Sequence, residues 1–156
     1  MQNPDIQALL EDLKKPDEAV RENATRELWR IWFTQKGIYG LEILERSQML
    51  MEAEKFREAE TLLNQLIADQ PDFAEAWNRR AVLYFVQQNY RKSLADCEQV
   101  EKLNPIHFGA IHGKGLCHAA MGNYVAAIQA FRRALEIQPY AIANQRLILE
   151  CNARLS

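Results

Sequence analysis

Apolar residues recur at intervals of three and four positions along almost the whole chain, which is the spacing of one face of an α-helix. In residues 17–33, for example, Val20, Ala24, Leu28 and Ile31 would form such a face. The alternation of apolar and polar residues that marks β-strands is nearly absent. The pattern therefore predicts an all-α fold.

Two series of residues recur at an interval of 34 positions. They are Pro71, Pro105 and Pro139 in the first series, and Phe56, Tyr90 and Tyr124 in the second. Proline lacks an amide hydrogen and disfavours a helical conformation in the residue before it, so each of these prolines is expected to end a helix. The repeat divides the middle of the chain into three equivalent units, residues 40–73, 74–107 and 108–139.

The three units share further columns, in which large and small residues alternate. The columns hold Ile43, Arg46, Ser47, Leu50, Ala59, Leu63 and Pro71 in the first unit, Trp77, Arg80, Ala81, Tyr84, Ser93, Cys97 and Pro105 in the second, and Ile111, Lys114, Gly115, His118, Ala127, Phe131 and Pro139 in the third. With these columns, about two thirds of the chain resembles the tetratricopeptide repeat (TPR). The resemblance implies a right-handed α-solenoid of three TPR helix pairs, with a concave groove lined mainly by the first helix of each pair.

The segments on either side of the repeats are expected to be helical as well. Residues 1–39 are interpreted as an N-terminal helical hairpin, in which the phrase PDEAVRENATREL resembles one helix of a HEAT-type repeat. Trp29, Trp32 and Phe33 make the second helix apolar on more than one side, so we expect the first repeat or a partner to cover it. Residues 140–156 suit a C-terminal capping helix that shields the last repeat.

Composition and charge narrow the classes of function. The chain is 48% hydrophobic and 26% charged, which is typical of a globular protein. Its formal net charge of -2 gives no general attraction to nucleic acids or acidic membranes, so neither is expected as a partner. The sequence lacks an apolar run of ~20 residues and the apolar core of a signal peptide. Three cysteines without a CxxC pair favour reduced thiols and a cytoplasmic location.

The stretch FGAIHGKGLCHAAMG, residues 108–122, is dense in glycine, histidine and cysteine and invites a search for chemistry. Its GKG motif does not fit a phosphate loop, because no serine or threonine follows the lysine. His112 and His118 would point about 240° apart around a helix, so they would not share a metal ion. His118 falls in the tyrosine column and Cys97 in the phenylalanine column, and both are interpreted as core residues. We expect no catalytic residues, no metal and no cofactor.

The face that lines the groove in this family is expected to be mainly apolar here, with a few polar side chains. Its residues would be Leu44, Gln48, Asn78, Arg79, Val82, Phe85, Gly109, His112, Gly113 and Leu116. Such a groove suits a peptide or helical segment of a partner protein better than a small charged metabolite. Within it, Asn78, Arg79 and His112 would fix the register of the bound backbone.

Some members of the family hold the acidic tails of heat-shock chaperones in a clamp of lysine, arginine and asparagine side chains. The corresponding columns of this chain contain Leu44, Gln48, Arg79, Gly109 and Gly113, which supply a single cation. Because this differs from the clamp, we do not expect that specificity to transfer.

The function of two features of the charge distribution stays open. Arg46, Arg80 and Lys114 form a ladder where leucine is usual in the family, and these side chains either contact an acidic partner or extend from a helix seam over apolar surface. Residues 40–73 carry a formal charge of -5 and residues 108–156 a formal charge of +3, an asymmetry that could steer a partner or promote head-to-tail association.

These observations favour a non-catalytic scaffold or adaptor that holds a segment of another protein in its groove. One alternative is a self-associating structural module whose interface is the N-terminal hairpin or an uncovered terminal face. Another alternative is a metal or redox protein that uses Cys117 and His112.

Overall fold

The computed structural model describes residues 5–156, and the described residues fold into helices and connecting turns. The helices are α1 (Ile6–Asp12), α2 (Glu18–Phe33), α3 (Gly37–Glu52), α4 (Phe56–Asp69), α5 (Ala74–Val86), α6 (Tyr90–Leu103), α7 (Phe108–Ala120), α8 (Tyr124–Ile137) and α9 (Ile142–Leu155). The all-α prediction is confirmed over this part of the chain.

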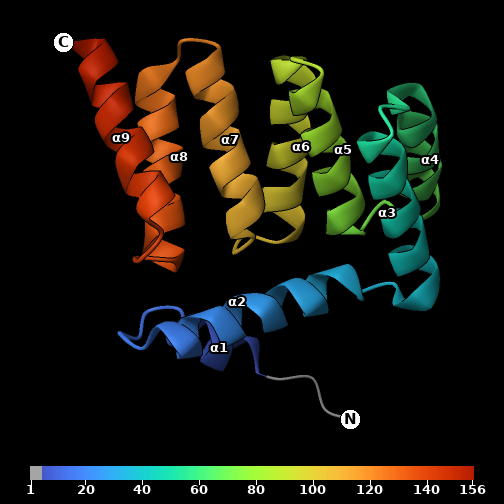
Figure 1. The fold of residues 1–156 in the computed structure, drawn as a ribbon, viewed down its shortest axis with the longest axis horizontal. Coiled ribbons are helices and arrows are strands. Elements are labelled where there is room, and N and C mark those ends of the chain that lie inside the picture. Colours follow the sequence, from blue (N-terminus) through green and yellow to red (C-terminus); the bar gives the residue numbers. More distant parts are fainter. Residues whose placement is uncertain (1–4) are drawn as a thin grey trace.

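Helices α3 to α8 form three antiparallel pairs that stack side by side into a solenoid, with α9 packed on its C-terminal end (Figure 1). The pairs are α3 with α4, α5 with α6, and α7 with α8, which are the three helix pairs that the 34-residue period predicts. Each pair is too short to bury its own apolar face, so neighbouring pairs share a continuous core.

Small residues allow the two helices of a pair to approach closely. A Cβ atom built on Gly115 of α7 would lie 2.5 Å from the Phe131 ring of α8, so even alanine would collide with it. Ser93 of α6 is buried and its hydroxyl donates a hydrogen bond of 2.7 Å to the carbonyl oxygen of Ala81 on α5. The small columns of the repeat therefore mark the contact between the helices.

The turn between the helices of each pair has the same backbone geometry in all three repeats. Glu54, Gln88 and Gly122 adopt positive φ angles of 60°, 62° and 82° at equivalent positions, 34 residues apart. The amide of the following residue donates to the carbonyl oxygen five residues before it, as from Asn89 N to Tyr84 O at 2.8 Å. This left-handed residue ends each first helix in a Schellman-type cap.

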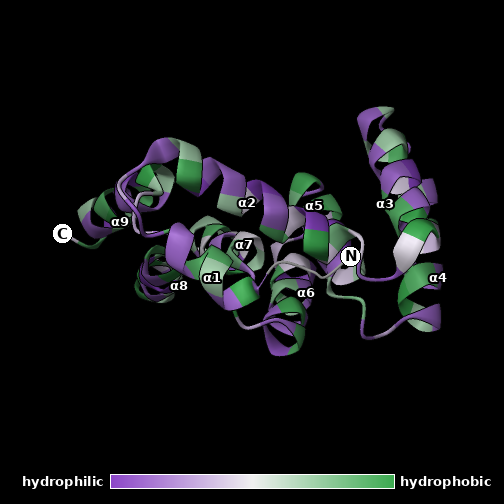
Figure 2. Ribbon diagram, turned by 90° about the horizontal axis from the view of Figure 1, so that it is seen from below, coloured by the Kyte–Doolittle hydropathy of each residue, from purple (hydrophilic) through white to green (hydrophobic). Residues whose placement is uncertain are grey.

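Helix α2 does not extend the stack but crosses it, running below α7 and α8 at a steep angle to the repeat helices (Figures 1 and 2). Leu28 and Trp32 of α2 pack in one apolar cluster with Phe108 and Ile137 of the third repeat. The sequence suggested the first repeat or a partner as the cover for this helix, and the structure instead places most of that cover in the third repeat. Of the three aromatic residues, Phe33 packs against the first-repeat cluster.

A buried polar pair fixes the crossing point. His107, which caps α7, accepts a 3.0 Å hydrogen bond from the Ala110 amide through Nδ1, so its Nε2 donates to the carboxylate of Glu75 at the start of α5. Both side chains are fully buried. The Trp32 ring of α2 stacks on the imidazole at a centroid distance of 4.5 Å. The pair thereby ties the second and third repeats to α2.

Candidate binding groove

The first helices of the second and third repeats enclose a mainly apolar pocket of about 230 Å³. Its lining residues are Asn78, Ala81, Val82, Phe85, Ser93, Cys97, Gly109, His112, Gly113 and Leu116. Val82, Phe85 and Leu116 supply its apolar surface, and Asn78 and His112 supply polar groups at its wall. Such a pocket is suited to an apolar side chain flanked by polar backbone.

A second, wider hollow of about 630 Å³ lies between α2 and α5. Its lining residues are Arg26, Trp29, Arg30, Phe33, Asn78, Arg79 and Val82. Asn78 and Val82 belong to both hollows, so the two form one continuous depression, which we call the α5 groove. Its floor is α5, and its walls are α7 on one side and α2 on the other.

Seven of the ten residues that the sequence predicts for the groove line the pocket between α5 and α7, and Arg79 lines the wider hollow. Leu44 lies instead in the core, because Phe33 of α2 and Phe73 pack in the same cluster and cover it. Gln48 accepts a 2.6 Å hydrogen bond from Arg79 Nη1 and thus holds that guanidinium in place. The first repeat therefore contributes little to the groove.

The two groove-facing glycines of α7 have different surroundings. A Cβ atom on Gly109 would lie 2.7 Å from the Trp29 ring, so this glycine leaves room for α2. A Cβ atom on Gly113 would lie 3.2 Å from Cys97 Sγ, the nearest atom in the pocket wall. These glycines therefore have a structural role. Gly109 leaves space for the Trp29 ring, and Gly113 leaves space in the pocket.

His112 is held from the side of α9. Its Nδ1 lies 2.7 Å from Oδ1 of the buried Asn144, so Nδ1 carries the proton that the amide oxygen accepts. Within residues 5–156, Nε2 makes no hydrogen bond of its own. A neutral His112 can therefore accept a hydrogen bond from a bound backbone amide through Nε2.

Arg79 is a cation largely shielded from water. Burial lowers the pKa of its guanidinium, although nearby Glu75 partly opposes this. Its Cζ lies 5.8 Å from the centre of the Phe33 ring, and its buried Nε has no hydrogen-bond partner among the described residues. Arg79 therefore brings one largely shielded cation to the wider hollow, and the four other clamp columns supply none.

Two cysteines meet beneath the pocket. The Cys117 thiol of α7 donates a 3.3 Å hydrogen bond to Ser93 Oγ of α6, one helical turn from Cys97. A hydrogen bond from the Cys97 thiol lowers the pKa of Cys117, although burial partly opposes this. Both thiols are buried, as the interpretation of Cys97 as a core residue requires.

The other histidine and metal candidates do not converge. Among the described residues, no group of three or more histidine, cysteine or acidic side chains is placed to hold a metal ion. His112 and Cys117, the pair named for a metal or redox role, bond to Asn144 and Ser93 respectively.

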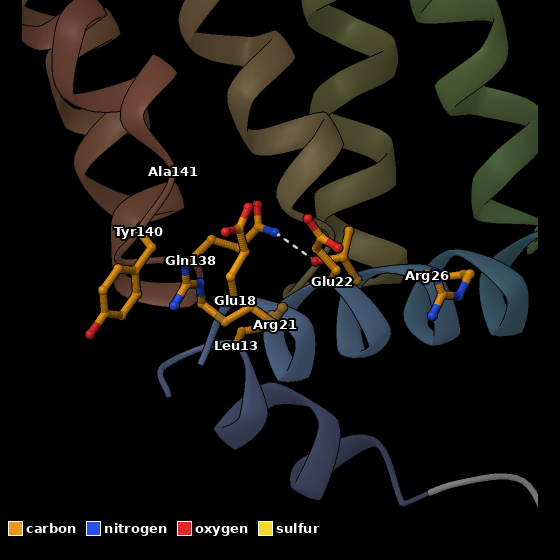
Figure 3. A pocket seen from close by; sticks show the side chains of 9 residues that line it. Leu13, Glu18, Arg21, Glu22, Arg26, Gln138, Tyr140 and Ala141 are labelled. Atoms are coloured by element: carbon orange, nitrogen blue, oxygen red, sulfur yellow. Dashed lines mark hydrogen bonds between the residues drawn. The ribbon is translucent and has the colours of Figure 1, made fainter. Parts of the chain in front are cut away.

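A third hollow, of about 360 Å³, lies where the start of α2 meets the turn between α8 and α9 (Figure 3). The Arg21 guanidinium lies over the Tyr140 ring at 4.1 Å, and Gln138 Nε2 approaches Thr25 Oγ1 at 3.5 Å. These contacts attach the first turns of α2 to the end of the third repeat, so this region positions the wall of the α5 groove.

The basic ladder is engaged within the chain at two of its three positions. Arg80 of α5 makes two 2.8 Å hydrogen bonds to the carboxylate of Asp96 on α6. Lys114 of α7 pairs with Glu101 of α6 at 3.0 Å. Arg46 is exposed and forms no ion pair with any described residue.

Sequence reasoning missed the contribution of α2. Trp29, Phe33, Arg26 and Arg30 form one wall of the groove, yet they lie outside the repeats that define it. Two signals were available, namely the three large aromatic residues on one helix and the missing side chain at Gly109.

Stacked helix pairs with a preformed groove define a helical-repeat interaction module, and the comparisons with known proteins agree. Two family models described as tetratricopeptide repeat match the chain, over residues 44–105 and 110–140. The chain belongs to the tetratricopeptide repeat family.

Proteins of similar sequence occur in Rhizobium etli and in Mus musculus. A TPR repeat-containing protein of Rhizobium etli is 33% identical over 135 residues, which cover 86% of this chain and 66% of the relative. DnaJ homolog subfamily C member 7 of Mus musculus is 27% identical over 125 residues, which cover 72% of this chain and 25% of the relative. The chain thus spans about two thirds of the first relative and a quarter of the second.

Solved structures share the fold. The first TPR domain of Spaghetti (RPAP3), bound to the HSP90 peptide SRMEEVD, superimposes with a TM-score of 0.71 at 20% identity and covers 74% of this chain and 91% of that domain. A MamA protein gives a TM-score of 0.69 at 16% identity, covering 96% of this chain and 81% of its own. Because the MamA match covers almost the whole chain, the likeness extends beyond the three repeats. None of the helices between residues 5 and 156 is long and apolar enough to cross a membrane.

Proposed function

We propose that this protein is a non-catalytic adaptor that holds a peptide or helical segment of a partner protein in the α5 groove. The observation that carries the proposal is the preformed apolar pocket between α5 and α7, which shares Asn78 and Val82 with the hollow walled by α2. Preformed apolar pockets with a few polar groups are typical binding sites. The three free cysteines support a cytoplasmic location, where thiols stay reduced.

The bound segment would insert an apolar side chain between Val82, Phe85 and Leu116. Its backbone would bond to the Asn78 amide and to His112 Nε2, which fix its register along α5. Burial of the apolar side chain would supply most of the affinity, because the groove needs no reorganisation to accept it.

Acidic peptides should fit this groove less well than they fit the RPAP3 domain, whose structure contains the peptide SRMEEVD. Of the five clamp columns, Leu44 is buried, Gln48 bonds to Arg79, Gly109 lies under Trp29, and Gly113 has no side chain. Among these five columns, Arg79 is the one cation, and the other arginines of the hollow, Arg26 and Arg30, lie on α2 outside the clamp columns. We therefore expect SRMEEVD to bind this chain more weakly than it binds the RPAP3 domain in the same calorimetric titration.

The groove is tested by one substitution at the point where its two hollows meet. Val82→Arg places a long charged side chain in both hollows, and it should remove the captured partners because the apolar pocket is blocked. Val82 is 41% exposed, so the fold should tolerate the change. The measurement is affinity capture from native extract with quantitative mass spectrometry of the bound proteins.

Val86→Arg is the matched control. Val86 lies one turn further along α5, is 54% exposed, and lines neither hollow. We expect it to recover the partners of the native protein. If Val82→Arg, still folded by circular dichroism, recovers them equally well, the α5 groove is not the binding site.

A further inference from the structure

Helix α9 occupies the place of the first helix in a fourth repeat. The first helices of the second and third repeats begin at Ala74 and Phe108, and α9 begins at Ile142, after the same interval of 34 residues. Like α5 and α7, it packs on the second helix of the preceding pair (Figure 1). Unlike them, it has no second helix of its own among the described residues.

This difference leaves one face of α9 uncovered. In α3, α5 and α7, the small column of Ser47, Ala81 and Gly115 is buried against the second helix of the pair. The equivalent residue of α9 is Leu149, which is 70% exposed. Leu149 is therefore a large, solvent-exposed apolar residue at a position where the three repeats have a small, buried residue.

The uncovered face has a simple pattern. Ile142, Arg146, Leu149 and Ala153 follow the helical spacing of four, three and four residues, so they share one side of α9. Ile142 is 60% exposed, and Arg146 forms no ion pair with any residue between 5 and 156. We call this side the α9 face, and it carries a positive charge between two apolar residues.

The opposite end of the solenoid carries a complementary pattern on α3. Ile38, Glu42, Glu45 and Met49 follow the spacing of four, three and four residues. Ile38 is 76% and Met49 67% exposed, and in the described part of the chain neither glutamate forms an ion pair. This α3 face thus has two negative charges between two apolar residues.

Figure 1 places α9 and α3 at opposite ends of the molecule, so the two faces cannot meet within one chain. We propose that the α9 face of one copy docks on the α3 face of a second copy, which joins the solenoids head to tail. Ile142 and Leu149 would bury their side chains against Ile38 and Met49, and Arg146 would pair with the two glutamates.

Charge supports a second copy of this chain as the occupant. The formal charge is -5 over residues 40–73 and +3 over residues 108–156, so the two ends attract each other and like ends repel. Because the faces differ, the contact is heterologous and each added copy leaves a free face at either end. One helix on one helix buries less area than a permanent interface, so the assembly should depend on concentration.

Sedimentation of the full chain from low to high micromolar concentration tests the proposal. We expect the weight-average mass of the native protein to rise with concentration. Arg146→Glu and, separately, the double variant Glu42→Lys/Glu45→Lys should each weaken self-association by roughly tenfold or more, because like charges then face each other. An equimolar mixture of the two variants should associate again, since opposite charges meet at every junction.

Arg132→Glu is the matched control for Arg146→Glu, since Arg132 is exposed on α8 and lies outside both faces, and the two substitutions change the net charge by the same amount. It should associate like the native protein. A native protein that stays monomeric at every concentration would overturn the proposal, as would variants that assemble normally or a mixture that does not recover. Val82→Arg should leave assembly intact, so failure of the α5 groove and failure of this contact are separate results.

Discussion

At the scale of single residues, three equivalent turn positions share one backbone conformation but carry different side chains. Glu54, Gln88 and Gly122 all adopt positive φ angles at the end of a first helix. This conformation brings Cβ too close to the backbone, a cost that glycine avoids. The first two repeats therefore carry a small strain that the third does not.

Replacing Gln88 by glycine should relieve this strain. We expect Gln88→Gly to raise the free energy of unfolding by about 0.5 to 1 kcal/mol, because the cap geometry is kept without the Cβ contact. The reverse change, Gly122→Gln at the equivalent position, should lower it by a similar amount. Urea denaturation measures both, and a stability ranking in the opposite order would contradict the assigned backbone geometry.

His118 gives the stability a dependence on pH. Burial lowers the pKa of His118, with Lys114 as a further cause, and its buried Nδ1 has no partner among the described residues. The unfolded chain therefore takes up the proton more readily than the folded one. Stability from the neutral imidazole is present above the usual histidine pKa of 6.5 and is lost as the pH falls below it.

The variant His118→Tyr, which restores the usual residue of this column, should remove that part of the loss. Urea denaturation at about pH 7.5 and about pH 5.5 should show a smaller decrease in the variant than in the native protein. Equal decreases in the two proteins would mean that the folded state does not disfavour the charged imidazole.

At the scale of helices, the basic ladder shows how burial decides what an ion pair contributes. Arg80 and Asp96 join α5 to α6, and the Asp96 side chain is 5% exposed. Lys114 and Glu101 join α7 to α6, and each is 29% exposed. Removal of a buried partner leaves an uncompensated charge, whereas an exposed pair contributes little.

The two rungs of the ladder therefore make a matched comparison. Arg80→Ala should lower the free energy of unfolding by about 3 to 5 kcal/mol, because Asp96 is left buried without its partner. Lys114→Ala, at the equivalent position of the next repeat, should cost about 1 kcal/mol or less. Chemical denaturation of both variants checks the difference, and similar losses would show that the Asp96 carboxylate is better solvated than its position indicates.

Helices α3 to α8 could be predicted from the sequence because each feature occurs three times. The 34-residue interval identified the repeat boundaries, and the small column identified Gly115 as a contact with the neighbouring helix. The position of α2 could not be predicted in the same way. This helix occurs once in the chain, so no equivalent helix is available for comparison. The buried pair of Glu75 and His107, which anchors it, connects residues 32 positions apart and so falls outside the repeat.

The columns of α5 and α7 place their residues at the pocket, whereas the wall formed by α2 could not be read from the repeat. Val82, His112 and Leu116 line the pocket, as their columns imply. Leu44 follows the same columns but is buried, because Phe33 from outside the repeats packs over its cluster. A tertiary contact from a segment without periodicity overrides the family pattern at this position.

At the scale of the whole molecule, α2 holds the repeats together by packing across them. It packs against the third repeat through Trp32, walls the groove through Trp29, and covers the first repeat through Phe33. A groove held in this way loses little conformational freedom when a ligand binds. Among the described residues α2 covers neither the α3 face nor the α9 face, so the proposed binding in the groove and the proposed contact between copies would not exclude each other.

The central claim is that a partner segment binds in the α5 groove. The most direct measurement is an amide chemical-shift map recorded while a segment of a captured partner is titrated into the isotope-labelled protein. We predict that the largest changes occur at Asn78, Val82, Phe85, His112 and Gly113 and disappear in Val82→Arg. Largest changes on α4, α6 or α8, with the groove amides unmoved, would contradict it.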